Sequence, residues 1–254
     1  HPEYQGKPLV VGFSEGRGVI AAASYEARQF GIHSAIPTKR ALELCPQLVF
    51  AAPRFSRYRE VSQHIRNIFY EYTELVEPLS LDEAYLDVTS NHKGIASAEV
   101  IAREIKAKIK ETLGLTASAG VSYNKFLAKI ASDVNKPDGL FIITPDSAPT
   151  FLAQLAIEDF YGVGKVTAAK MHELGIKTGA DLLALNESEL SRHFGKAGIS
   201  YYGYARGIDH RAVDPFQPQK SIGVEETFFD DLTLKESIIE ELEIIATELV
   251  SRAI

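Results

Sequence analysis

Apolar residues recur at intervals of three and four in three long stretches of the chain. These stretches are residues 56–75, 97–113 and 234–254. The spacing predicts amphipathic helices, because residues three and four apart share one face of an α-helix. The middle helix also has recognisable ends, since Ser97 is a favoured N-cap residue and Gly114 is typical of the position that terminates a helix.

Between the first two helices the apolar residues alternate with a period of two, which predicts two half-buried strands. Two adjacent acids, Asp82 and Glu83, stand where the strands join, so we expect them at a hairpin tip or strand end that faces solvent. Further strands are predicted over residues 116–122, 140–144 and 220–229. The alternating apolar residues around the acids are Leu79, Leu81, Ala84, Leu86 and Val88.

The order of these elements indicates an α+β fold. Two pairs of predicted strands alternate with two amphipathic helices, as in a ferredoxin-like sandwich. Small strands and a helix over residues 25–30 precede this region, and short helices with glycine-rich turns follow from about residue 145. Residues 214–219 contain two prolines and predict an extended linker.

Composition narrows the class of protein. The chain has 254 residues, a net charge of −7 and a single cysteine, Cys45, which excludes an internal disulfide. Its scattered histidines show no zinc-ligand spacing. No apolar run is long enough to cross a bilayer and no signal peptide is visible, so we expect a soluble, cytoplasmic protein without a membrane partner. We also expect the protein to be a monomer.

The negative charge is concentrated near one end of the chain. Residues 225–248 hold nine acids and one lysine, whereas residues 101–140 hold seven bases and four acids. The overall charge therefore does not exclude a basic face that binds nucleic acid.

Asp82 and Glu83 are the first candidates for chemistry. Adjacent carboxylates repel each other and resist joint ionisation unless a cation neutralises them. Mg²⁺ prefers such oxygen ligands, and sites with two metal ions use them to stabilise an in-line phosphoryl displacement. The alternative is a solvated acidic turn, which is the usual environment of neighbouring surface acids.

Two groups of residues are candidates for binding phosphate. Gly162, Gly164 and Lys165 stand at a predicted helix entry, where backbone N–H groups bind anions, in a pattern that resembles a DNA-binding helix-hairpin-helix. A tight turn between packed helices is the alternative. Tyr25 and Arg28 lie three apart near the start of a short helix, either as a triphosphate clamp or as an ordinary surface pair.

Three lysines are weaker candidates. Lys125 and Lys129 lie four apart on a predicted helix over residues 124–134, where they form either a solvated face or contacts with template phosphates. Lys136 precedes Pro137 in a turn, and a lone lysine in a turn is usually just solvated.

In chain order these segments resemble the Y-family translesion DNA polymerases, most closely the DinB branch. The likeness extends over essentially the whole chain, and its most specific parts are SLDEAYLD at residues 80–87 and KPDG at residues 136–139. The other matching segments are ASYEARQFG at 23–31, AGVS at 119–122, NKFLAKIAS at 124–132 and GVGK at 162–165.

The resemblance implies a right-hand polymerase. Residues 1–54 would be the fingers, 55–144 a ferredoxin-like palm, 145–211 a thumb with the helix-hairpin-helix, 212–219 a linker, and 220–254 the start of an incomplete little-finger domain.

The resemblance also implies the chemistry. Asp82 and Glu83 would bind two Mg²⁺ ions, while Tyr25, Arg28 and Lys136 would hold the triphosphate of the incoming deoxynucleotide. The partners would be primer–template DNA, deoxynucleoside triphosphates and, through a segment beyond residue 254, a sliding clamp. The reaction would be low-fidelity synthesis past damaged bases in DNA repair.

The chain departs from the family pattern at its start. The family begins with a strand that carries Asp-x-Asp, and the first of these acids supplies a third metal ligand; His1 corresponds to a position after them. We therefore expect residues 1–254 alone to bind metal poorly and to polymerise little. Two alternatives remain: a non-catalytic DNA-binding module that uses residues 162–165, and a nucleotide cyclase with the same carboxylate pair.

Overall fold

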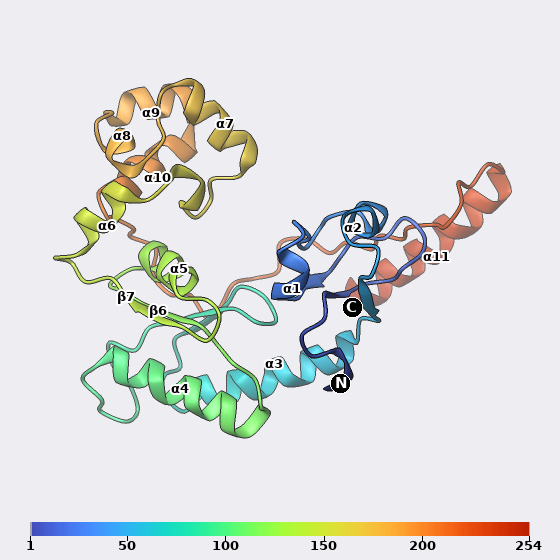
Figure 1. Ribbon diagram of the computed structural model, residues 1–254, viewed down its shortest axis with the longest axis horizontal. Helices are drawn as coiled ribbons and strands as arrows, with labels where there is room; N and C mark the ends of the chain where they lie inside the picture. The colour runs from blue at the N-terminus through green and yellow to red at the C-terminus, as the bar shows by residue number, and fades with distance from the viewer. Residues whose placement is uncertain (1, 254) are drawn as a thin grey trace. The chain divides into compact units, whose positions relative to one another are not determined.

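The computed structural model describes residues 2–253, which form two compact units (Figure 1). One unit contains residues up to 57 together with those from 218 onward, and the other contains residues 58–217. His1 and Ile254, the first residue of the predicted fingers and the last of the predicted C-terminal helix, lie outside the described residues. The five-part division into fingers, palm, thumb, linker and little finger stays a prediction.

The first unit contains a small mixed sheet. Strand β1 (Leu9–Val11) pairs antiparallel with β2 (Ala22–Ala23) and parallel with β3 (Val49–Ala51). A 3₁₀ turn, η1 (Pro2–Tyr4), precedes the sheet, and helices α1 (Tyr25–Arg28) and α2 (Thr38–Leu44) complete this region. The apolar core is formed by Val10, Ile20, Ala27, Ile32, Ala41, Cys45 and Leu48.

The C-terminal part of this unit corrects one prediction and confirms another. Residues 220–229, all within the described part of the chain, form no strand. An alternating sequence forms a strand only where a partner strand accepts its backbone hydrogen bonds, and no such pairing is present for these described residues. The predicted helix is confirmed as α11 (Lys235–Ala253), in which most of the large apolar side chains, among them Leu242, are exposed.

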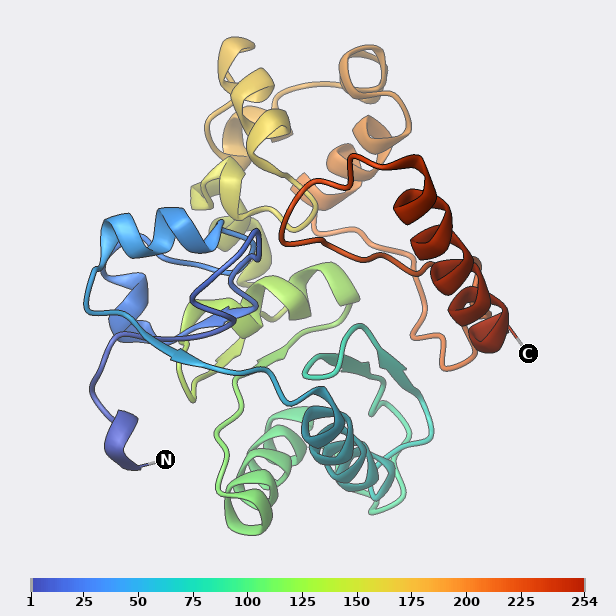
Figure 2. The same cartoon turned by 90° about the vertical axis from the view of Figure 1, so that its right-hand side faces the viewer.

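The first elements of the second unit are two long helices and two pairs of short strands; the first three residues of the first helix still belong to the other unit. Figure 2 shows α3 (Phe55–Tyr70) and α4 (Ala98–Leu113) side by side. Strands β4 (Val76–Pro78) and β5 (Ala84–Leu86) form an antiparallel hairpin, while β6 (Ala119–Val121) and β7 (Leu140–Ile142) pair in parallel. The buried residues between these elements are Ile68, Tyr72, Ile101, Ile105 and Ile109.

Helix α4 has the ends that its sequence predicts. The Ser97 side chain accepts a hydrogen bond from the backbone N–H of Val100, and Gly114 adopts the left-handed conformation with φ of +67°. The predicted helix over residues 56–75 was too long, because α3 ends at Tyr70. The Thr73 hydroxyl donates to the carbonyl of Asp87 and accepts from the N–H of Leu75, which diverts the chain into β4.

The remaining helices of this unit share an apolar core with helix α5 (Lys125–Val134). The Phe126 ring of α5 stacks on Tyr204, with ring centroids 4.0 Å apart. Figure 1 shows the helices that follow β7 within this unit gathered into one cluster, and residues from them belong to one apolar core with α5. They are α6 (Ala148–Gln154), the 3₁₀ turn η2 (Ile157–Asp159), α7 (Lys165–Glu173), α8 (Gly179–Leu183), α9 (Glu187–Phe194) and α10 (Lys196–Ala205). Within residues 2–253 no helix combines the length and the apolar character needed to cross a membrane.

Gly120 allows β6 to pack closely on α5. A Cβ atom at this position would lie 2.1 Å from the carbonyl oxygen of Ala128 and 2.3 Å from the nitrogen of Ser132. We predict that Gly120→Ala lowers the free energy of unfolding by about 1–3 kcal/mol, because the two backbones must separate. The measurement is urea unfolding followed by circular dichroism.

The control for this variant is Gly223→Ala. A Cβ atom at Gly223 meets nothing within 4 Å, so the change in unfolding free energy should stay within about 0.5 kcal/mol. Equal effects of the two substitutions would show that the contact between β6 and α5 is not as close as described.

Candidate active site

Asp82 lies at the exposed tip of the β4–β5 hairpin, as the alternating pattern predicts. Backbone N–H groups of Leu79 and Ser80 donate to the carbonyl of Glu83 and close the tip. The Ser80 hydroxyl donates to the Asp82 carboxylate at 2.7 Å and accepts from the Asp82 N–H at 3.3 Å. This local turn holds the Asp82 carboxylate while leaving it open to solvent. Leu79 and Leu81 belong to the tip and not to the preceding strand, which ends at Pro78.

Glu83 is paired with a lysine from helix α5. Its Oε1 lies 3.1 Å from the Nζ of Lys129, whose side chain is only 15 % exposed. Burial by itself would lower the pKa of Lys129, but the hydrogen bond to Glu83 and the charge of Asp133 outweigh it and raise that pKa. Lys129 is therefore charged at neutral pH and partly neutralises the carboxylate pair.

The charges continue along α5 to the turn that carries Lys136. Lys129 Nζ lies 3.6 Å from Oδ2 of Asp133, and Oδ1 of Asp133 lies 2.5 Å from Nζ of Lys136. Acid and base thus alternate from Glu83 to Lys136. The fold connects one predicted metal ligand, Glu83, to the predicted phosphate-binding lysine through a chain of ion pairs, whereas Asp82 is bonded to Ser80.

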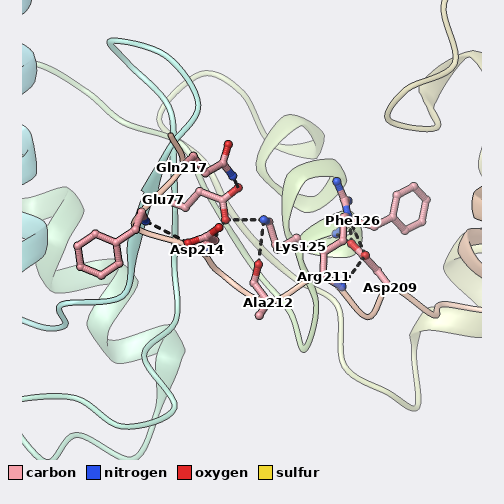
Figure 3. A network of polar contacts seen from close by, with 9 residues as sticks. Glu77, Lys125, Phe126, Asp209, Arg211, Ala212, Asp214 and Gln217 are labelled. Atoms are coloured by element: carbon pink, nitrogen blue, oxygen red, sulfur yellow. Dashed lines mark hydrogen bonds and ion pairs between the residues drawn. The ribbon is translucent and has the colours of Figure 1, made fainter. Parts of the chain in front are cut away.

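Lys125 is buried and bonded within the protein, and not exposed as a contact with DNA would require (Figure 3). Only 8 % of its side chain is exposed, and its ammonium lies 2.5 Å from Oε2 of Glu77, itself buried on β4. The same ammonium donates to the carbonyl of Ala212 at 3.1 Å. Since Lys125 faces this interior network, a contact with a template phosphate would require the network to open.

Glu77 is the centre of that network. Besides Lys125, its carboxylate accepts hydrogen bonds from the N–H of Asp214 at 2.7 Å and from the side chain of Gln217 at 2.9 Å. Burial would raise the pKa of Glu77, but the hydrogen bonds from Lys125 and Asp214, with the charges of Lys125 and Arg211, hold that pKa below its usual value. Figure 3 shows these groups converging from three separate segments.

A second buried acid continues the network toward α5. The Asp209 carboxylate accepts two hydrogen bonds from the Arg211 guanidinium, both at 2.8 Å, and one from the N–H of Phe126 at 3.0 Å. Burial would raise the pKa of Asp209, but its bonds with Arg211 and Phe126 lower it. Together Glu77 and Asp209 fasten residues 209–217 to β4 and α5. Sequence analysis missed both acids; the signal for Glu77 was a lone acid among apolar strand residues.

Tyr25 and Arg28 lie in the first unit, on helix α1. The Arg28 guanidinium carbon lies 5.6 Å from the centre of the Tyr25 ring, and its Nε donates to the carbonyl of Ala23. The two side chains therefore share one side of α1, as their spacing predicts. Because Asp82 and Lys136 belong to the second unit, the meeting of all these groups at one nucleotide stays a prediction.

The glycine-rich segment before α7 forms an open helix entry. Gly162 has φ of +93°, a conformation that favours glycine, and Gly164 is the N-cap residue of α7. Val163 is buried between them, whereas Lys165 at the first helical position is exposed. Backbone N–H groups and a lysine thus face solvent together, which suits a phosphate. Contact of this segment with DNA stays a prediction.

Asp82 and Glu83 could supply the protein ligands of a magnesium site. Among residues 2–253 no group of three or more histidine, cysteine, aspartate or glutamate side chains could hold a metal ion. Mg²⁺ is, however, usually bound by one or two carboxylates, with waters and substrate phosphates as its other ligands. Asp82 and Glu83, adjacent and reachable from solvent, offer oxygen ligands of that kind.

Comparison with known families gives two matches along the chain. Residues 1–133 match the impB/mucB/samB family, and residues 145–176 match the helix-hairpin-helix motif of the IMS family. The first match contains the carboxylate pair, and the second contains the glycine-rich segment before α7.

Curated relatives resemble almost the full chain. DNA polymerase IV 3 of Mesorhizobium japonicum is 59 % identical over 242 residues, which cover 95 % of this chain and 67 % of that protein. DNA polymerase IV of Bacteroides fragilis is 56 % identical over 252 residues, covering 99 % of this chain and 69 % of the relative. The chain thus spans about two thirds of the length of these relatives.

Solved structures show the same fold. A Y-family DNA polymerase chimera, Dbh-Dpo4(243-245)-Dbh, superposes with a TM-score of 0.89 at 34 % identity, covering 99 % of this chain and 74 % of that one. DinB from Sulfolobus solfataricus has a TM-score of 0.77 at 37 % identity, with 85 % of this chain and 64 % of that chain covered.

The buried pair of Glu77 and Lys125 should be costly to break. We predict that Glu77→Gln lowers the free energy of unfolding by about 3–5 kcal/mol, because it leaves the Lys125 charge buried without compensation. Glu99→Gln is the matched control: it removes one partner of the exposed pair with Arg103 and should change the same quantity by less than about 1 kcal/mol. Urea unfolding measures both.

Acid should remove the stabilisation that Glu77 provides. A carboxyl group whose pKa is lowered by folding stabilises the protein above its ordinary pKa, which is 4.5 here, and loses that effect as pH falls through the lowered value. The difference in unfolding free energy between the unaltered protein and Glu77→Gln should therefore be constant from about pH 6 to 8 and shrink at acidic pH. A difference that grows as pH falls would contradict this assignment.

Proposed function

The chain belongs to the impB/mucB/samB family and has the fold of the Y-family translesion DNA polymerases, and we propose that Asp82 and Glu83 form its polymerising centre. Its reaction is low-fidelity, template-directed DNA synthesis past damaged bases. The observation that supports this proposal most directly is a pair of adjacent carboxylates at a hairpin tip. One of them, Glu83, is connected to Lys136 by ion pairs that run through Lys129 and Asp133.

The side chains have distinct roles in this proposal. Asp82 and Glu83 hold two Mg²⁺ ions, which supply charge neutralisation for the phosphoryl group that is transferred. Lys136, with Tyr25 and Arg28 from the first unit, binds the triphosphate of the incoming deoxynucleotide. Ser80 keeps the Asp82 carboxylate oriented through its hydroxyl. The protein's contribution is mainly positioning and electrostatics.

The proposed partners are those of a polymerase. The helix entry at residues 162–165 binds the DNA backbone without reading its sequence, since it offers backbone N–H groups and one lysine. Lys129 contributes positive charge beside the carboxylates, a clamp would bind through a segment beyond residue 254, and the protein acts as a monomer in the cytoplasm. Domain limits at residues 54, 144, 211 and 219 belong to the same proposal.

A non-catalytic DNA-binding module is the weaker alternative. It would need the helix entry but would have no use for the carboxylate pair at the hairpin tip or for the ion pairs that connect Glu83 to Lys136. The similarity to proteins named DNA polymerase IV over nearly the whole chain also favours the polymerase.

The direct test is primer extension by the full-length protein with Mg²⁺ and deoxynucleotides. We predict that Asp82→Asn and Glu83→Gln each lower kcat by at least about a thousandfold. The two carboxylates act together, so the loss of either one removes most of their joint effect on the rate. Glu74→Gln is the control, since the 77 % exposed Glu74 side chain makes an ion pair only with His92 among the described residues.

Two outcomes would overturn parts of this proposal. If Asp82→Asn spares primer extension while Lys165→Ala abolishes DNA binding, the protein is a binding module. If residues 1–254 alone extend primers as fast as the full-length protein, the expectation that these residues lack a necessary metal ligand is wrong.

A further inference from the structure

Lys106 of helix α4 is bound to the turn that carries Lys136. Its ammonium donates to the carbonyl oxygen of Asp138 at 2.6 Å, to the carbonyl oxygen of Gly139 at 2.9 Å and to the Asp138 carboxylate at 3.0 Å. A lysine ammonium has three N–H donors, so all of them are used. Only 15 % of this side chain is exposed. Lys106 is thus a fixed contact and not a solvated surface charge.

The turn itself adopts a conformation that needs support. Asp138 has φ of +52°, which is uncommon for a residue other than glycine and persists where surrounding contacts hold it. A Cβ atom at Gly139 would lie 1.9 Å from the carbonyl oxygen of Asn135, so the chain is also tightly folded there. The carbonyl of Gly139 accepts from the N–H of Ala119 at 3.0 Å as well. Lys106 binds the turn from α4, while β6 binds it from another direction.

Another lysine of the same helix makes a different contact. Nζ of Lys110 lies 3.7 Å from the Asp138 carboxylate, and 66 % of its side chain is exposed. Lys110 therefore places a similar charge near the same acid without holding the backbone of the turn. Substitution of each lysine in turn can therefore distinguish the effect of a positive charge near Asp138 from the effect of hydrogen bonds to the backbone of the turn.

We propose that Lys106 is a positioning residue for nucleotide binding, which holds residues 136–139 so that Lys136 presents its ammonium to the triphosphate. This inference rests on the proposed function, in which Lys136 binds phosphate. Lys106 acts through the backbone of the turn and does not touch the nucleotide. It makes no contact with the carboxylates at the hairpin tip, which lie on a separate element.

The experiment measures KM and kcat for incorporation of one nucleotide by the full-length protein. Lys106→Met removes the three hydrogen bonds and keeps most of the aliphatic stem. It should raise KM for the nucleotide about tenfold with little change in kcat, because it weakens ground-state and transition-state binding equally. Lys110→Met, the matched control, should change KM by less than about twofold, as expected for an exposed pair.

A double variant shows whether Lys106 acts through Lys136. Lys136→Ala should raise KM at least about tenfold, and adding Lys106→Met should raise it no further. If Lys106 acts only through Lys136, its substitution has no effect once the Lys136 ammonium is gone, so the two effects on KM do not add. Circular dichroism at the assay temperature establishes that each variant is folded. If Lys106→Met is not folded, Lys106→Arg replaces it, with an expected rise in KM of about threefold, since the rigid guanidinium cannot reproduce three converging bonds.

The outcomes separate this inference from the proposed function. If Lys136→Ala raises KM but the Lys106 variant does not, or if the two effects multiply, Lys106 is not a positioning residue and the polymerase stands. If Lys110→Met has the same effect as Lys106→Met, charge and not contact is responsible, and the inference is again wrong. If the unaltered protein extends no primer, the proposed function itself fails.

Discussion

The buried ion pair between Glu77 and Lys125 determines where the candidate site is assembled. Glu77 lies on β4, which leads into the hairpin tip, and Lys125 is the first residue of α5. A buried charge is tolerated only beside a partner, so this pair fixes β4 against α5 in one arrangement. Glu83 at the tip then meets Lys129, one helical turn beyond Lys125. The neighbouring acid Asp209 and the segment after it are fastened to the same point.

Electrostatics at the tip follow from this arrangement. Two adjacent carboxylates would repel each other in isolation, and Lys129 reduces that repulsion while leaving Asp82 open to solvent. The charge of Lys129 is maintained by its hydrogen bond to Glu83 and by Asp133, which also pairs with Lys136. In the proposed reaction, a cation that binds Asp82 and Glu83 would therefore meet carboxylates that hydrogen bonds and an ion pair already orient. Such preorganisation is the main way in which an enzyme assists phosphoryl transfer.

Family membership and the geometry of the site are independent reasons for proposing a polymerase. The likeness to DNA polymerase IV proteins extends over nearly the whole chain, yet a fold does not by itself assign chemistry. The proposed assignment of the reaction to Asp82 and Glu83 rests on their adjacency at the hairpin tip, on the exposure of Asp82 and on the ion pairs that connect Glu83 to Lys136. Hydrogen bonds from Lys106 to the turn after Lys136 are likewise the basis for the proposed positioning role of Lys106, a residue of no evident importance in the sequence.

The sequence by itself determined features whose causes are local. The ends of α4 at Ser97 and Gly114, the hairpin tip at Asp82 and Glu83, and the polymerase motifs could all be recognised because neighbouring residues produce them. Tertiary structure decided the end of α3, the absence of a strand at residues 220–229, and the buried positions of Lys125 and Glu77. Each of these depends on partners far away in the chain, and periodicity and spacing carry no information about which distant group will accept a hydrogen bond or neutralise a charge.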